Sequence, residues 1–330
     1  MPQEHLFTYV KLKGSKLSPE SLSGREPSIA EVLRRLSSGE VSIDAQPFVS
    51  VILADGAHWL SGRTYTYARR ILGTSSYEAR EGVTFTASRG AWLVEGEPKP
   101  VEPPVGAPKA ERYVLVETQH SRRLGLGGFV VEERFVFRGF KGEDVEIGRV
   151  SGYRYFLAAY KRNGTPLTEP ELRNTLLWRN YLGRDEVIKA LGGVSKFLKK
   201  ELWHLERIGE HAVRKYKVVW RDVARRFIPA VELTGAIPDY TVNYVTVDSP
   251  EEAYYLLAVL LTPQINAVVE ELSPWVGHVQ PRFIKYFRIP RYNPGRDVHR
   301  QLADIGRSVH SKGGVSEEDL RKIEELVERL

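Results

Sequence analysis

Apolar and polar residues are mixed near the start of the chain in patterns typical of β-strands. Residues Leu6–Leu12 combine the two kinds of residue as a strand does, and Phe48–Leu53 is an apolar run rich in β-branched residues. Between them, Ser28–Leu36 has a capping serine, a glutamate three residues later and apolar residues at helical spacing. We therefore predict a strand, a helix and a second strand in this part of the chain.

Further strands are predicted after a proline-rich segment at 97–108, which we interpret as a surface loop. The β-branched and aromatic residues that favour strands are concentrated at Tyr113–Glu117, Phe129–Phe137 and Tyr153–Tyr160. The chain up to about residue 165 is therefore predicted to be mainly β.

Helical spacing replaces the β pattern after Thr168, where Glu171 completes a capping box. We expect helices to dominate up to Trp203. A second small sheet is then predicted from three segments rich in β-branched and aromatic residues: Tyr216–Trp220, Phe227–Leu233 and Tyr240–Val247.

Two helices near the C-terminus have clear start signals. Asp248–Leu261 begins with polar capping residues, a proline in the first turn and two glutamates, and its apolar face is expected to be deeply buried. Ser316–Leu330 begins with a capping serine and has apolar residues at helical spacing. We expect this amphipathic helix to dock on a partner surface.

Together these elements predict an α+β fold with two small mixed β-sheets and flanking helices. We divide it into a β-rich N-terminal part at 1–165, a helical part with a small sheet at 166–315, and a C-terminal amphipathic helix at 316–330.

The composition supports a folded protein and excludes cysteine chemistry. With 330 residues, 42% of them hydrophobic, the chain can bury a substantial core. It has no cysteine and its one methionine is Met1, which excludes disulfides, thiolate metal ligands and a cysteine nucleophile. This composition, with abundant Arg, Glu and Pro, indicates a thermophilic source, although codon bias would give a similar picture. The absence of a signal sequence and of a long apolar stretch indicates a cytoplasmic protein with no membrane span.

The motifs of methyltransferase catalysis are missing from the sequence. The glycine turn that admits the cofactor and the Asp/Asn-Pro-Pro-aromatic loop that holds a flipped base are both absent, and we interpret Pro103–Pro104 and Gly125–Gly128 as turns. The histidines are scattered, with His299 and His310 too far apart for a helical zinc pair. We therefore expect no cofactor and no metal site in this chain.

Nuclease chemistry has weak candidates. Asp239 is followed by Glu251 and Glu252, but no lysine completes the set of groups that would hold a metal ion. We interpret Asp239 as a turn residue. A nucleic-acid enzyme with a degenerate carboxylate site is kept as the alternative hypothesis, and a structural RNA-binding protein as a third.

Positive charge is concentrated in two segments, at 196–226 and 282–307, within a chain of net charge +6. Aromatic residues are interleaved with the basic ones, as where a chain follows phosphates, although charged surfaces over buried aromatic residues give the same pattern. The candidate DNA-binding residues are Arg214, Lys215, Lys217, Arg221, Arg225, Arg226, Arg282, Lys285, Arg288 and Arg291.

Four stretches resemble, in the same order, the target-recognition region of adenine-specific DNA methyltransferases of the TaqI-like and type IIG restriction-modification kind. The first is Tyr77–Val83, with its Arg-x-Gly-Val pattern, followed by Gly90–Val94. The others are Phe137–Val145, then Lys215–Trp220 with Phe227–Val231, then Glu252–Leu261 with Ile265–Asn266 and Phe287–Pro290.

This resemblance implies a specificity subunit that recognises duplex DNA in a sequence-specific manner. Catalysis and S-adenosylmethionine would then belong to a methyltransferase or restriction partner, and this chain would not be an enzyme by itself. The sequence departs from the family in two respects: Leu261–Pro263 stands where the family has Leu-Asn-Ser, and the catalytic half is missing. A split gene, a separate specificity subunit and a remnant are all compatible with these departures.

Overall fold

The structure of the chain, a computed structural model, combines helices with several small sheets and confirms the α+β class. Most of the helix predicted at 28–36 lies outside the described residues. The described residues are 5–13, 30, 33–34, 37–39, 42–85, 90–198, 201, 203–224, 226–273 and 277–330.

The start of the chain forms a three-stranded antiparallel sheet. Its strands are β1 (His5–Lys13), β2 (Ser42–Leu53) and β3 (Gly56–Ser61). β1 and β2 confirm the strands predicted at 6–12 and 48–53. Val49 and Val51 point to the buried face of β2, as alternate residues of a strand do. Helix α2 (Gly62–Ala68) follows β3 directly.

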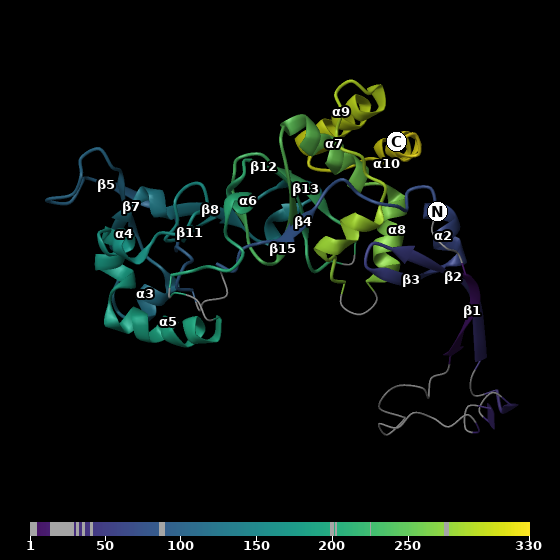
Figure 1. Cartoon of the computed structure of the whole chain (residues 1–330), viewed down its shortest axis with the longest axis horizontal. Coiled ribbons are helices and arrows are strands. Elements are labelled where there is room, and N and C mark those ends of the chain that lie inside the picture. The colour runs from purple at the N-terminus through teal and green to yellow at the C-terminus, as the bar shows by residue number, and fades with distance from the viewer. Residues whose placement is uncertain are drawn as a thin grey trace.

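A six-stranded mixed sheet occupies the middle of the molecule (Figure 1). Its strands, in spatial order, are β4 (Ala79–Glu81), β15 (Val242–Val247), β12 (Tyr216–Arg221), β13 (Pro229–Glu232), β10 (Gly148–Val150) and β9 (Val145–Glu146). β10 runs parallel to β13, and the other neighbouring strands are antiparallel. The sheet takes strands from both sides of residue 165, and the proposed domain boundary there stays a prediction.

Helices from the C-terminal part cover one face of this sheet and share its largest core. These elements are α7 (Pro250–Leu260), α8 (Pro263–Leu272), the 3-10 helix η4 (Pro281–Tyr286), α9 (Asp297–Lys312) and α10 (Glu317–Val327). Val218 and Trp220 of β12 point into this core, which also buries Val49 and Leu60 of the N-terminal sheet. One core therefore joins the N-terminal and C-terminal elements.

A second core lies at the other end of the molecule (Figure 1). Two three-stranded sheets build it: β5 (Lys99–Val101), β6 (Tyr113–Val116) and β7 (Phe129–Glu132), and β11 (Arg154–Leu157), β8 (Val136–Phe140) and β14 (Ile237–Pro238). The helical elements in this region are α3 (Gln119–Arg123), η1 (Glu133–Phe135), α4 (Glu169–Arg173), the π-helical turn η3 (Trp178–Leu182), α5 (Asp185–Leu198) and α6 (Glu210–Val213). The 3-10 turn η2 (Gly142–Asp144) lies beside β12 of the six-stranded sheet. Phe85 and Phe156 stack at its centre with their rings 4.1 Å apart.

In the described part of the chain the strands are therefore divided among four sheets, more than the two that were expected. The single strand predicted at Phe129–Phe137 is interrupted by the 3-10 turn η1. The capping box of Thr168 and Glu171 is confirmed, but the helical region after it is divided into α4, η3 and α5.

Helices α7 and α10 begin where the sequence indicated. Ser249 caps α7, and the helix is buried on all sides. Ser316 caps α10, but the expectation that this helix docks on a partner surface is wrong. Its apolar residues Ile323, Leu326 and Val327 are already buried against α7, α8 and α9 of the same chain.

Two glycines permit close approaches that a side chain would prevent. A Cβ atom on Gly306 of α9 would lie 2.0 Å from the backbone oxygen of Tyr254 in α7. A Cβ atom on Gly82, in the Arg-x-Gly-Val stretch, would lie 2.1 Å from the backbone oxygen of Asp239. Gly82 N–H instead donates to Val242 O at 2.9 Å, which fixes this stretch beside the start of β15.

No single helix in the described part of the chain has the length and apolar character needed to cross a membrane. Helices α7 and α8 meet that test only as a pair bent by 65°.

Candidate nucleic-acid interface

The end of the first basic segment contacts the residues that directly precede the second. Val223, in the loop after β12, forms a β-bridge with His278, which precedes η4. Ala224 N–H donates to Gly277 O at 2.7 Å, and His278 Nδ1 lies 2.8 Å from a carboxylate oxygen of Asp222. We call residues 221–227 and 277–288 the joined basic segments.

Buried polar groups hold the joined basic segments together. Trp220 Nε1 and Asn243 Nδ2 both donate to Val279 O at 2.8 Å. Phe227 N–H donates to Asn266 Oδ1 at 2.9 Å, so an asparagine of the fourth resembling stretch fixes the end of the loop. Because buried donors and acceptors are costly to leave unpaired, these bonds define the path of both segments. Asn243 and Asp222 were not identified from the sequence as organising residues, because their partners are distant in the sequence.

Lys217 was predicted to bind DNA, and that assignment is wrong. Its side chain is fully buried, its ammonium group donates to Arg214 O and Ala236 O, and Nζ lies 3.9 Å from Glu232 Oε2. Burial lowers the pKa of Lys217 to about 8, although the Glu232 carboxylate opposes this. An ammonium group enclosed in this way has no access to a phosphate.

Three other predicted residues have acidic partners on the surface. Arg214 pairs with Asp248 at 2.7 Å, Arg282 with Asp55 at 3.2 Å and Arg291 with Glu252 at 3.2 Å. An ion pair reduces the charge that an arginine offers to DNA, so these three are weaker candidates for phosphate contacts.

Asp55 has two further partners besides Arg282. The Asp55 carboxylate accepts from Tyr286 Oη at 2.6 Å and contacts His58 Nε2 at 2.6 Å. Partial burial acts to raise the pKa of Asp55, but the hydrogen bonds from Tyr286 and His58 outweigh it and hold that pKa below its usual value. The cluster joins the β2–β3 turn to η4.

The remaining predicted residues differ in how available they are. Arg221 is half-buried and donates to Val145 O at 2.8 Å. Arg225 lies outside the described residues. Within the described part of the chain, no carboxylate pairs with any of four exposed cations: Lys215, Arg226, Lys285 and Arg288. Three of these, Arg226, Lys285 and Arg288, lie on or directly beside the joined basic segments, which makes these segments the best candidate for contact with an anionic partner.

The carboxylates considered for nuclease chemistry are each engaged separately. Asp239 is buried and accepts from Thr241 N–H at 3.1 Å, which confirms it as a turn residue. Glu252 accepts from Tyr77 Oη at 3.0 Å and from Asp248 N–H at 2.8 Å. Glu251 lies 3.6 Å from Arg307. Among the described residues, no group of three or more histidines and carboxylates could hold a metal ion.

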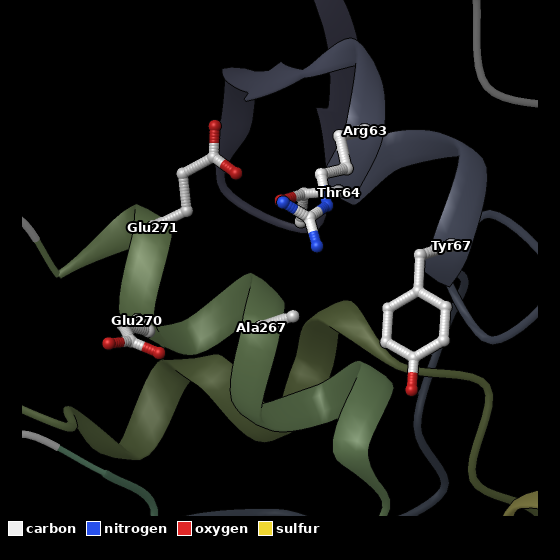
Figure 2. Close-up of a pocket in the computed structure, with 6 residues that line it drawn as sticks. All are labelled: Arg63, Thr64, Tyr67, Ala267, Glu270 and Glu271. Carbon is white, nitrogen blue, oxygen red and sulfur yellow. The ribbon is translucent and has the colours of Figure 1, made fainter.

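A cavity of about 550 Å³ lies between α2 and α8. Figure 2 shows Arg63, Thr64 and Tyr67 on α2 facing Ala267, Glu270 and Glu271 on α8. Glu271 accepts from Ser61 Oγ at 3.0 Å, and burial together with the nearby Glu324 raises the pKa of Tyr67 to about 12. With carboxylates along one wall, this cavity is poorly suited to phosphate.

A second cavity, of about 450 Å³, lies between β4, β15 and the region of α6. Two arginines line it: Arg80, from the Arg-x-Gly-Val stretch, and Arg207, from the first basic segment. Neither was among the predicted DNA-binding residues, because no sequence motif marks either arginine and the two are brought together only by the fold.

No protein-family model and no curated protein matches this chain. Among solved structures, the chain is similar to the type IIL restriction-modification enzyme MmeI in complex with DNA, with a TM-score of 0.43 and 10% identity over 78% of this chain. It is also similar to the type IIG restriction endonuclease BpuSI, with a TM-score of 0.41 and 12% identity over 97% of this chain. The matches cover 34% of the MmeI chain and 39% of the BpuSI chain.

Proposed function

We propose that this chain recognises a duplex DNA sequence as the specificity part of an adenine-N6 methyltransferase or restriction-modification system. Catalysis, with S-adenosylmethionine, is assigned to a methyltransferase or restriction partner. The observation that carries the proposal is the contact of the loop after β12 with residues 277–279, because it joins the end of the first basic segment to the chain that leads into the second, and both segments carry exposed cations. The ordered resemblance of four stretches to target-recognition regions supports the same function.

The burial of the aromatic residues favours duplex DNA over a single strand. Single-stranded nucleic acids are bound largely by stacking of bases on exposed aromatic rings. In the joined basic segments, Phe283, Tyr286 and Phe287 are at most 2% exposed, so their rings pack in the core and offer no stacking surface. The exposed cations beside them suit the phosphates of a duplex, which disfavours the alternative of a single-stranded RNA-binding protein.

Replacing Arg226, Lys285 and Arg288 together with alanine is expected to weaken duplex binding and its dependence on salt. Each phosphate contact contributes about −0.9 to the slope of log K against log salt concentration. The slope for the triple variant should therefore be smaller in magnitude by about 2 to 3. Fluorescence anisotropy of a labelled duplex, titrated between about 50 and 200 mM salt, measures it.

The matched control replaces Arg112, Arg173 and Arg184, which are exposed, carry the same total charge and pair with acidic neighbours. This control should retain nearly the whole slope. Equal losses in both variants would show that net charge alone attracts the DNA. Failure of the unmodified chain to bind any duplex at low salt would overturn the proposed function.

The role of a partner needs a separate assay. Adding this chain to the product of the neighbouring gene is expected to give methylation directed to one DNA sequence. Methylation with the same sequence preference in the absence of this chain would contradict a specificity role.

A further inference from the structure

The cavity between β4, β15 and α6 has a donor and an acceptor side by side at its rim. Arg207 Nη2 lies 2.6 Å from Glu81 Oε2, and both side chains are 45% exposed. Both groups of the pair are therefore accessible from solvent. A ligand at this rim would meet guanidinium N–H donors next to carboxylate acceptors.

The backbone of Arg207, which lines the cavity, is unusual. Arg207 has φ of 61° and is the one non-glycine residue in the described part of the chain with positive φ. For a residue with a Cβ atom this conformation costs about 1 kcal/mol or more, and such residues are concentrated at binding sites.

The wall of the cavity combines charged and apolar residues. Tyr244 of β15 lies opposite Arg80 of β4 in the strand register, and both line the cavity. The charge of Arg80 is close enough to oppose the effect of burial, which raises the pKa of Tyr244 to about 12. Ile208 and Ala212 contribute apolar wall.

These features fit a nucleobase better than a small anion. An isolated phosphate would be repelled by the carboxylate of Glu81, and by that of Glu78, which lies 3.5 Å from Arg80. A nucleobase has both acceptors and N–H donors on its edge, which match the donors and acceptors of the Arg207–Glu81 pair. Guanine matches most fully, because its O6 accepts next to N–H groups that donate. The volume is in the range of small-ligand pockets.

We propose that this cavity binds a single unpaired nucleotide of the bound DNA, with the base edge on the Arg207–Glu81 pair. This inference rests on the proposed function, because the nucleotide is part of the recognised duplex. Beyond duplex recognition, this chain would itself bind one base that lies outside the helical stack.

The test compares three duplexes of one sequence: fully paired, with one unpaired guanine, and with an abasic residue in place of that guanine. Anisotropy titrations are expected to show the unpaired guanine binding at least about fivefold tighter than the abasic residue, as for one base-edge contact. Arg207→Gly, which tolerates positive φ, should abolish this preference, and Glu81→Gln should as well. Both variants should bind the fully paired duplex as the unmodified chain does.

Arg184→Ala is the matched control, because Arg184 is 46% exposed and sits beside Glu186. It should keep the preference for the unpaired guanine. Equal binding of the guanine and abasic duplexes overturns this inference alone, since the fully paired duplex still reports on duplex recognition. Loss of binding to all three duplexes overturns the proposed function and this inference with it. Thermal melting of each variant confirms that it is folded.

Discussion

Glu232→Gln is expected to lower the free energy of unfolding by about 3 kcal/mol at neutral pH, because it leaves the charge of Lys217 buried without a counter-charge. Both side chains are fully buried. The Glu232 carboxylate also accepts from Thr234 N–H at 2.8 Å and Gly235 N–H at 3.0 Å, and glutamine retains only one oxygen for these donors. Urea denaturation at pH 7 measures the change.

The loss of unfolding free energy caused by Glu232→Gln should be smaller in alkaline solution. In the unmodified chain the pKa of Lys217 is about 8, below the ordinary lysine value of 10.5, so between these values the unfolded state binds more protons and stability rises with pH. Without the carboxylate this pKa falls further, so Lys217 in the variant becomes neutral at lower pH. Denaturation at pH 10 should therefore show a smaller difference than at pH 7.

A double variant separates the charge effect from lost packing. Lys217→Met combined with Glu232→Gln removes the buried charge, and it is expected to recover most of the lost stability. If the double variant is as unstable as Glu232→Gln alone, the buried charge is not the cause.

Gly306→Ala is expected to destabilise the protein by about 2 kcal/mol, although alanine favours helices. The added Cβ atom would lie 2.0 Å from Tyr254 O and 2.7 Å from Tyr254 C. These are backbone atoms of α7, so α9 must move away from α7 as a whole. Chemical denaturation gives the free energy of unfolding.

The control for this substitution is Gly192→Ala in α5, where no atom lies within 4 Å of the added Cβ. There alanine should stabilise the protein by up to about 1 kcal/mol. Similar effects of the two substitutions would mean that the close approach of α9 to α7 does not limit the size of residue 306.

Local signals predicted the long elements well but not the interruptions. β2, α7 and α10 carry alternation or capping residues within their own segments, and each was found where expected. The break in the strand predicted at Phe129–Phe137 has no such signal. There Glu132 accepts from Leu176 N–H at 2.7 Å and Leu177 N–H at 3.1 Å, a contact between distant parts of the chain.

The candidate site was predicted as a set of basic residues, and the structure divides that set. Lys217 was misassigned because β12 is buried on both faces, so it lacks the alternation that would show which residues point inward. Arg282 and Asp55 are 227 residues apart in the sequence, so their pairing could not be predicted from local spacing. Arg226, Lys285 and Arg288 remain the predicted DNA contacts, which the triple alanine variant tests.

The pairing of β4 with β15 has a consequence for how the molecule forms during synthesis. Ala79 pairs with Val245, 166 residues farther along the chain. At about 5–20 residues per second, β4 waits about 10–30 s on the ribosome before its partner strand exists. Tyr244 arrives with that strand, so the cavity rimmed by Arg207 and Glu81 is completed late, after most of the second core has been translated.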